Sequence, residues 1–268
     1  MDNHLQTNLE HWNELTSIHA RSAFYDLEGF KAGQSSLKPI EVEELGDVAG
    51  KSLLHLQCHF GMDTLSWARR GARVAGVDFS DRAIATARAL SQELDLEAAF
   101  VCSDIYNLPN VLSGEFDIVF TSYGVLCWLP DLDRWAHVIA HFLKPGGTFH
   151  IVEEHPLTNI FEDDPTTGGF KIAYSYFHSP EPLRWEGEGT YADRNAQVEH
   201  RTTFEWTHSL SDIFNALRMA GLRLEFFHEF PYLMYRRLMC MEASEDGWWR
   251  FQDHSINIPL MFSLKASK

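Results

Sequence analysis

The sequence predicts an α/β protein built on a doubly wound, mostly parallel sheet of seven strands. From residue 51 onward, short apolar runs alternate with segments whose apolar residues recur every three or four positions. This alternation is typical of βαβ units, in which helices cover both faces of a parallel sheet. With 268 residues, 45% of them hydrophobic and 22% charged, the chain can bury such a sheet as a single domain.

The first five strands are expected where apolar runs end at polar residues. These runs are 51–58, 73–78, 98–102, 116–121 and 148–153. Between them, apolar residues at helical spacing predict helices over 62–70, 81–94 and 132–143. Gly71 is suited to end the first helix, and Ser80 is suited to cap the second.

Residues 1–50 precede the sheet and carry scattered aromatic side chains. We expect this segment to form a helical lid, with breaks at Gly29 and Gly33. Acidic residues close to its end predict a short helix exposed to solvent. These residues are Glu41, Glu43, Glu44 and Asp47.

After the fifth strand the alternation stops. The core 51–156 is followed by an inserted cap, 157–205, which is rich in tyrosine and tryptophan, and either two or three antiparallel strands or a long ordered loop would fit it. Segment 206–268 then returns to the sheet. Its capping box at Ser209 opens a helix that ends at Gly221, and strands are predicted over 222–227 and 258–264. The pattern predicts no structure for 231–253.

The net charge of −16 disfavours binding to nucleic acid or to anionic membranes. No apolar stretch approaches the length of a membrane helix, and the first ten residues do not resemble a signal peptide. The four cysteines are widely spaced, with no CxxC pair, so neither a disulfide framework nor a zinc site is indicated. We therefore expect a cytoplasmic protein. The sequence does not indicate its oligomeric state.

Polar residues follow each predicted strand at the edge where an open α/β sheet binds its ligand. Asp78 stands 17 residues after Gly61, and its carboxylate suits the two hydroxyls of a ribose. Asp104 is placed to accept a hydrogen from the amine of a base, whose faces Phe79 and Ile105 can cover. Neither a G-x-x-x-x-G-K-[ST] run nor a complete G-x-G-x-x-G pattern is present, so the pocket predicts a nucleoside without a phosphate.

Five segments in order carry a family resemblance: "LLHLQCHFG", "VAGVDFS", "VCSDIYNLP", "FDIVFTSYGVLCWLPD" and "LKPGGTFHI". Between Lys51 and Glu154 the chain resembles the class I S-adenosylmethionine-dependent methyltransferases, Rossmann-like enzymes that include small-molecule methyltransferases. The resemblance implies S-adenosyl-L-methionine as the cofactor. It places the turn after the first strand beside the methionine and ribose, Asp78 on the ribose, and Asp104 with Ile105 on the adenine. The complete set of cofactor-binding residues that it implies is Tyr25, Gln57, Cys58, His59, Gly61, Asp78, Phe79, Ser80, Asp104, Ile105, Ser122 and Tyr123.

The first turn departs from the family's pattern, which reads acidic-x-Gly-x-Gly-x-Gly. Here His55 replaces the acidic residue, Gln57 and His59 replace two glycines, and Gly61 remains. Glycines in such a turn allow positive φ and a close approach of the backbone. Either the cofactor takes another pose, or the polar substitutes bond it directly.

The resemblance implies methyl transfer to oxygen, nitrogen or sulfur. The tyrosine and tryptophan side chains of the insert 157–205 would form an aromatic wall over the site, which favours a small, partly apolar or aromatic acceptor. His155 and Tyr123 are the predicted catalytic residues, because both follow strands at the acceptor side. No metal is expected, since Glu153, Glu154 and His155 would alternate in direction along a strand. Two alternatives remain: a catalytically silent cofactor-binding protein and, less favoured by the missing glycines, a nicotinamide-dependent oxidoreductase.

Overall fold

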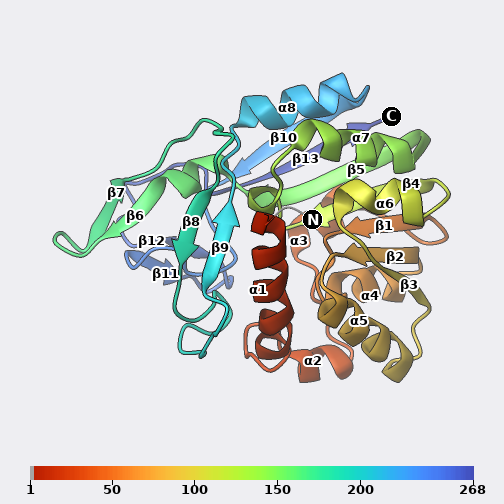
Figure 1. Ribbon diagram of the computed structural model, residues 1–268, viewed down its shortest axis with the longest axis horizontal. Coiled ribbons are helices and arrows are strands. Elements are labelled where there is room, and N and C mark those ends of the chain that lie inside the picture. Colours follow the sequence, from red (N-terminus) through yellow and green to blue (C-terminus); the bar gives the residue numbers. More distant parts are fainter. Residues whose placement is uncertain (1–2) are drawn as a thin grey trace.

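A computed structural model describes residues 3–268 and shows a seven-stranded sheet in the order β10-β13-β5-β4-β1-β2-β3 (Figure 1). The strands are β1 Ser52–Leu56, β2 Arg73–Asp78, β3 Ala98–Cys102, β4 Phe116–Ser122, β5 Leu143–Glu154, β10 Arg223–Phe230 and β13 Met261–Ser267. β1 to β5 pair in parallel, whereas β13 is antiparallel to both β5 and β10. The predicted fold class is therefore confirmed.

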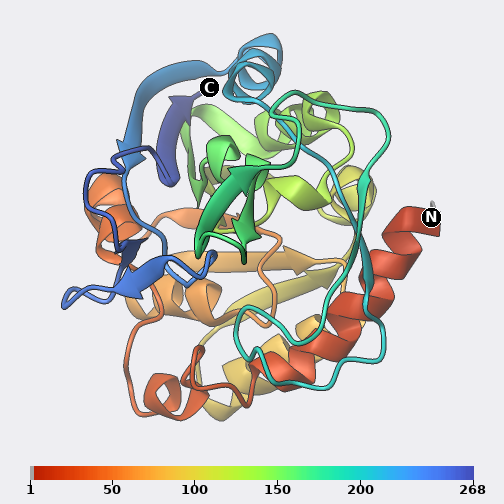
Figure 2. The same ribbon diagram turned by 90° about the vertical axis from the view of Figure 1, so that its left-hand side faces the viewer.

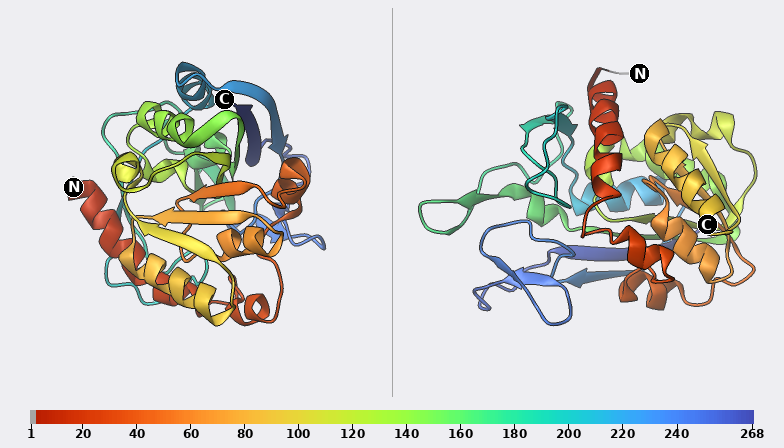
Figure 3. Two further views of the ribbon diagram at one scale, coloured as in Figure 1. Left: turned by 90° about the vertical axis from the view of Figure 1, so that its right-hand side faces the viewer. Right: turned by 90° about the horizontal axis from the view of Figure 1, so that it is seen from below.

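Helices cover both faces of the sheet (Figure 3). On one face lie α3 Pro39–Leu45, α4 Met62–Arg69 and α5 Asp81–Glu93; on the other lie α6 Leu108–Val111, α7 Leu132–Phe142 and α8 Leu210–Met219. Each face has its own core because strand side chains alternate between them. Trp135 of α7 and Trp67 of α4 are fully buried, one in each core.

The two helix caps predicted from the sequence, at Ser80 and Ser209, are present in the structure. The Ser80 hydroxyl accepts a hydrogen bond from the Ala83 N–H at the start of α5. At the start of α8, Ser209 and Asp212 form the reciprocal capping box. These caps satisfy N–H groups that lack partners within the helix.

The N-terminal segment forms α1 Asn3–His19 and α2 Leu27–Lys31 ahead of α3. The prediction of a solvent-exposed acidic helix is wrong for Glu41, which is fully buried, and for Glu44, which is largely enclosed. α3 packs against β5, so its inward positions meet the sheet. Glu44 there contacts His150 and His228 and accepts from Ser263, which offsets the cost of its burial.

Three two-stranded hairpins lie beyond the carboxyl ends of the parallel strands (Figure 1). They are β6 Phe161–Asp164 with β7 Gly169–Ile172, β8 Leu183–Glu186 with β9 Thr202–Glu205, and β11 Met241–Ala243 with β12 Trp249–Phe251. The segment 157–205 thus contains both antiparallel strands and long irregular stretches, and 231–253 contains the third hairpin.

Helix α1 runs alongside β9 (Figure 2). The buried Asn8 side chain donates to the Phe204 carbonyl over 2.7 Å and accepts from the Phe204 N–H over 2.8 Å. One amide therefore clamps the first helix to a strand almost 200 positions later in the sequence. None of the helices between residues 3 and 268 is long and apolar enough to cross a membrane.

Candidate functional site

A cavity of about 510 Å³ opens at the carboxyl ends of β1 to β5. Its walls come from the loops after these strands, from α1 and the turn after it, and from segments of both 157–205 and 231–237. β1 is the strand at which the chain switches direction across the sheet, with β2 on one side and β4 on the other. Such a switch point is where α/β sheets bind ligands.

The turn after β1 keeps a left-handed backbone at three alternate residues, with φ of 56° at Gln57, 49° at His59 and 83° at Gly61. A Cβ on Gly61 would lie 2.8 Å from the Phe100 ring, so glycine is required there. Gln57 and His59 are strained, and the surrounding structure holds them: the His59 N–H donates to Asp78 over 2.8 Å, and the Gln57 amide donates to the Val125 carbonyl over 3.1 Å. The departures from the glycine pattern therefore leave the turn in the conformation that glycines would allow.

Asp78 ends β2 and lines the cavity. Its carboxylate accepts from the backbone N–H groups of His59 and Ser80. Burial raises the pKa of Asp78 to about 6, although those hydrogen bonds act to lower it. Ser80 itself is buried behind the cavity wall, where its hydroxyl caps α5 and donates to Asn13 of α1.

Asp104 follows β3, the strand next to β2, and lines the same cavity with Phe79 and Ile105. One of its carboxylate oxygens accepts from the N–H groups of Tyr106 and Asn107, capping the 3₁₀ turn Ile105–Asn107. Within residues 3–268 the other oxygen has no hydrogen-bond partner. Asp104 thus both shapes a turn and presents an acceptor to the cavity.

Ser122 ends β4, Tyr123 follows it, and both line the cavity. The Ser122 hydroxyl donates to Asp63 over 3.1 Å, and the Tyr123 hydroxyl donates to Glu41 over 2.8 Å. Burial, reinforced by the charge of Asp63, raises the pKa of Glu41 to about 8. Burial likewise raises the pKa of Tyr123 well above its usual value.

His155, the other predicted catalytic residue, does not line this cavity. Its ring accepts from the Leu157 N–H over 3.0 Å and lies 3.1 Å from the Glu229 carboxylate of β10. It caps the 3₁₀ turn Pro156–Ile160 instead. A catalytic role for His155 therefore has no support in its position, while the preceding Glu154 does face the cavity.

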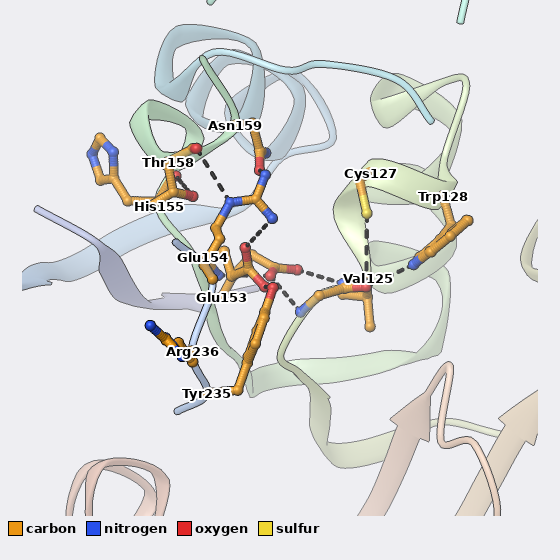
Figure 4. Close-up of polar contacts among 12 residues, drawn as sticks. Val125, Cys127, Trp128, Glu153, Glu154, His155, Thr158, Asn159, Tyr235 and Arg236 are labelled. Carbon is orange, nitrogen blue, oxygen red and sulfur yellow. Dashed lines mark hydrogen bonds and ion pairs between the residues drawn. The ribbon is translucent and has the colours of Figure 1, made fainter. Parts of the chain in front are cut away.

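At the far end of the cavity, Glu154 accepts from the Tyr235 hydroxyl over 2.7 Å (Figure 4). The Arg237 guanidinium lies 3.6 Å from Glu154. Glu153 behind it accepts from the backbone N–H groups of Gly124, Val125, Leu126 and Glu154. Burial, and the charge of Glu154, raise the pKa of Glu153 to about 7.

Aromatic side chains form the wall opposite the sheet. The Tyr25 hydroxyl is hydrogen-bonded to that of Tyr191, which joins the N-terminal segment to 157–205. His19 and His59 contact each other over 3.0 Å, and burial lowers the pKa of both, to about 3 for His19. The Trp12 ring lies 5.3 Å from that of His59. These side chains pack over the turn after β1.

The predicted residues that line the cavity are Tyr25, Gln57, Cys58, His59, Gly61, Asp78, Phe79, Asp104, Ile105, Ser122 and Tyr123. The sequence reasoning missed Glu205, Tyr235 and Arg237, which line the cavity and come from segments outside the strand-end pattern. It also missed Glu41, which does not line the cavity but binds Tyr123. Among residues 3–268 no group of three or more His, Cys, Asp or Glu side chains is arranged to hold a metal ion.

Residues 54–151 match a family model described as "Methyltransferase domain". A ubiquinone biosynthesis O-methyltransferase of Alkalilimnicola ehrlichii is 29% identical over 148 residues, which are 53% of this chain and 60% of that protein. The match therefore spans less than two thirds of that relative. Two solved S-adenosylmethionine-dependent methyltransferases, neither above 19% identity, share the fold.

The first structure, from Mesorhizobium loti, has a TM-score of 0.61 and 19% identity and covers 89% of this chain and 100% of its own. The second, described as putative and from Listeria monocytogenes, has a TM-score of 0.61 and 18% identity and covers 85% of this chain and 96% of its own.

Proposed function

We propose that this chain, which carries a class I S-adenosylmethionine-dependent methyltransferase domain, methylates a small, partly apolar acceptor at an oxygen, nitrogen or sulfur atom. The observation that carries the proposal is the meeting of Asp78, Asp104 and the left-handed turn 57–61 in one cavity. That arrangement supplies acceptors for a ribose and for an adenine amine without any phosphate cradle.

The residues present fit S-adenosylmethionine. Asp78 would accept from the ribose hydroxyls, and the free oxygen of Asp104 would accept from the adenine amine. Gln57 offers a further sign of fit, because its buried carbonyl oxygen has no hydrogen-bond partner within residues 3–268. A buried unpaired acceptor is costly, and the ammonium of the methionine end would satisfy it.

When bound, S-adenosylmethionine supplies an electrophilic methyl group together with its own leaving group. The residues of the chain then have to bind and align the reactants and to exclude water from them. Ser122 and Tyr123 would border the reacting side, and the wall of Trp12, Tyr25 and Tyr191 would keep water out. A general base is needed only for an acceptor that loses a proton, and Tyr123 with its Glu41 partner is the pair in position for it.

The acceptor chamber favours a small molecule with an apolar or aromatic body. Its lining includes the aromatic side chains of Trp128, Tyr191, Trp206 and Tyr235. The O-methyltransferase relative makes a hydroxyl the first acceptor group to test.

Titration calorimetry with S-adenosylmethionine and its demethylated product tests the proposal. Asp78→Ala is expected to weaken binding by about 1–3 kcal/mol, the cost of unpaired polar partners. Asp133→Ala, on an exposed turn of α7, serves as the control and should bind as the parent does. Absence of cofactor binding by the parent protein, or unchanged affinity of the Asp78 variant, would contradict the proposal.

The altered turn favours one second candidate, a cofactor-binding protein without transferase activity. Gln57 and His59 have a strained left-handed backbone, whereas glycines at these positions would adopt the same backbone without strain. Transfer of a labelled methyl group to phenols, amines and thiols separates the two. Binding without turnover over that whole panel would favour the silent protein.

A further inference from the structure

Glu205, the last residue of β9, has a carboxylate without a hydrogen-bond partner in the part of the chain that the structure describes, although the charge of Arg237 acts on it. Its side chain lines the cavity and is largely enclosed by protein, whereas its backbone pairs with Leu183 of β8. Its neighbours in the chain do have partners: Phe204 is clamped by Asn8 through its backbone, and the Trp206 N–H donates to the Cys127 carbonyl over 2.8 Å. The strand is therefore fixed while this one side chain remains available.

The direction of Glu205 follows from strand geometry. The Phe204 ring packs against His4 of α1, with 4.3 Å between the ring centroids. Successive side chains of a strand point to opposite sides, so Glu205 points away from α1 and into the chamber. The Trp206–Cys127 hydrogen bond holds it against Leu126–Trp128, the 3₁₀ turn that begins three residues after Tyr123. Glu205 thus lies on the acceptor side of the site.

The charged side chains near Glu205 indicate which kind of ligand group it can bind. Arg237 is directed at protein acceptors: its guanidinium lies 3.6 Å from Glu154 and donates to Thr158 and Asn159 over 3.3 and 3.2 Å. Glu154 is itself bonded by Tyr235. An anionic acceptor would have to displace Glu154 from Arg237, whereas a group carrying N–H or O–H would meet a free carboxylate.

From this arrangement we infer that Glu205 binds the acceptor molecule, accepting a hydrogen bond from an amine or hydroxyl attached to an apolar or aromatic body. This inference rests on the proposed function and specifies its acceptor class. Glu205 is a specificity-determining residue in this assignment. Burial raises the pKa of Glu205 to about 7. The charge of Glu154 also raises this pKa, whereas the charge of Arg237 lowers it, so the carboxyl is partly ionised at neutral pH.

Three matched probes test the assignment without requiring turnover: benzylamine, benzyl alcohol and benzoate. Each is titrated at millimolar concentration into the protein saturated with S-adenosylhomocysteine. The parent protein is expected to bind benzylamine most tightly, benzyl alcohol less tightly and benzoate least. Glu205→Gln keeps the shape and removes the charge, and should weaken benzylamine binding by about tenfold, the usual effect of losing one charged hydrogen bond.

The matched control is Glu181→Gln, an exposed residue of the same segment, which should leave all three affinities unchanged. Tightest binding of benzoate, no binding of any probe, or equal losses in the two variants would overturn the assignment. S-adenosylhomocysteine affinity is measured first for each protein. If the parent does not bind it, the proposed function fails; if it binds but the order of probes differs, only the role of Glu205 fails.

Discussion

Replacing Asp78 by asparagine should stabilise the cofactor-free protein at alkaline pH while weakening cofactor binding. Burial raises the pKa of Asp78 from 3.8 to about 6. A raised folded-state pKa means that the neutral carboxyl stabilises the fold fully at pH below about 4, and that this stabilisation is lost as the pH rises through about 6. Over that interval the ionised group costs about 3 kcal/mol, at about 1.4 kcal/mol per pKa unit.

Asparagine removes the charge but offers only one acceptor oxygen. The N–H groups of His59 and Ser80 then compete for it, at a cost of about 1–3 kcal/mol that does not depend on pH. The diagnostic quantity is therefore the difference in unfolding free energy between variant and parent, which should rise by about 3 kcal/mol between pH 4 and pH 8.

Urea unfolding of the cofactor-free proteins, followed by tryptophan fluorescence at several pH values, measures this difference. Calorimetry on the same samples should show weaker S-adenosylmethionine binding by the variant at every pH. The control Asp133→Asn, exposed on α7, should change neither quantity appreciably. A stability difference that stays constant across the pH range would refute the burial argument for Asp78.

Three further substitutions test the cavity walls. Gly61→Ala should destabilise the protein by about 2–4 kcal/mol in urea unfolding, because the backbone is left-handed and the new methyl group would meet Phe100; a loss under about 0.5 kcal/mol would contradict this. At Gln57, where φ is 56°, the glycine variant should be more stable than the alanine variant by about 1 kcal/mol, and the reverse order would show that the turn is not strained. Asn8→Ala should leave the Phe204 backbone unpaired and speed proteolysis within 173–205, which an unchanged cleavage pattern would disprove.

The strands and their polar ends were predictable because each depends on local sequence. Apolar runs that end at Asp78 or Ser122 and alternate with segments of helical periodicity indicate strands of a covered parallel sheet, and such strands bring their ends together. The conformation of Gln57 and His59 was not predictable in this way. It depends on hydrogen bonds to Asp78 and Val125, which are 19 and 68 residues away in the sequence.

The remaining site residues depend on contacts that no local pattern encodes. The acidic residues around Glu41 are typical of a helix exposed to solvent. The helix nevertheless packs against β5, which buries Glu41 beside Tyr123. Glu205 ends β9 and Arg237 lies in an irregular segment, and the local sequence pattern places neither of them at the cavity, because their approach to it depends on tertiary contacts. For His155 the local pattern predicted a place at the cavity, because the residue follows β5. Its ring instead turns toward Glu229, a contact that the local pattern does not encode.

The acidity of the chain acquires a local meaning in the cavity. Its lining includes Asp63, Glu154 and Glu205 besides the two carboxylates assigned to the nucleoside, whereas Lys38 and Arg237 are its lysine and arginine within the described residues. Asp78 and Glu205 have raised pKa values because burial penalises their charge. A positively charged ligand would relieve that penalty by stabilising the ionised forms. The same carboxylates that disfavour polyanionic partners therefore favour a sulfonium compound and an amine or hydroxyl acceptor in one enclosed space.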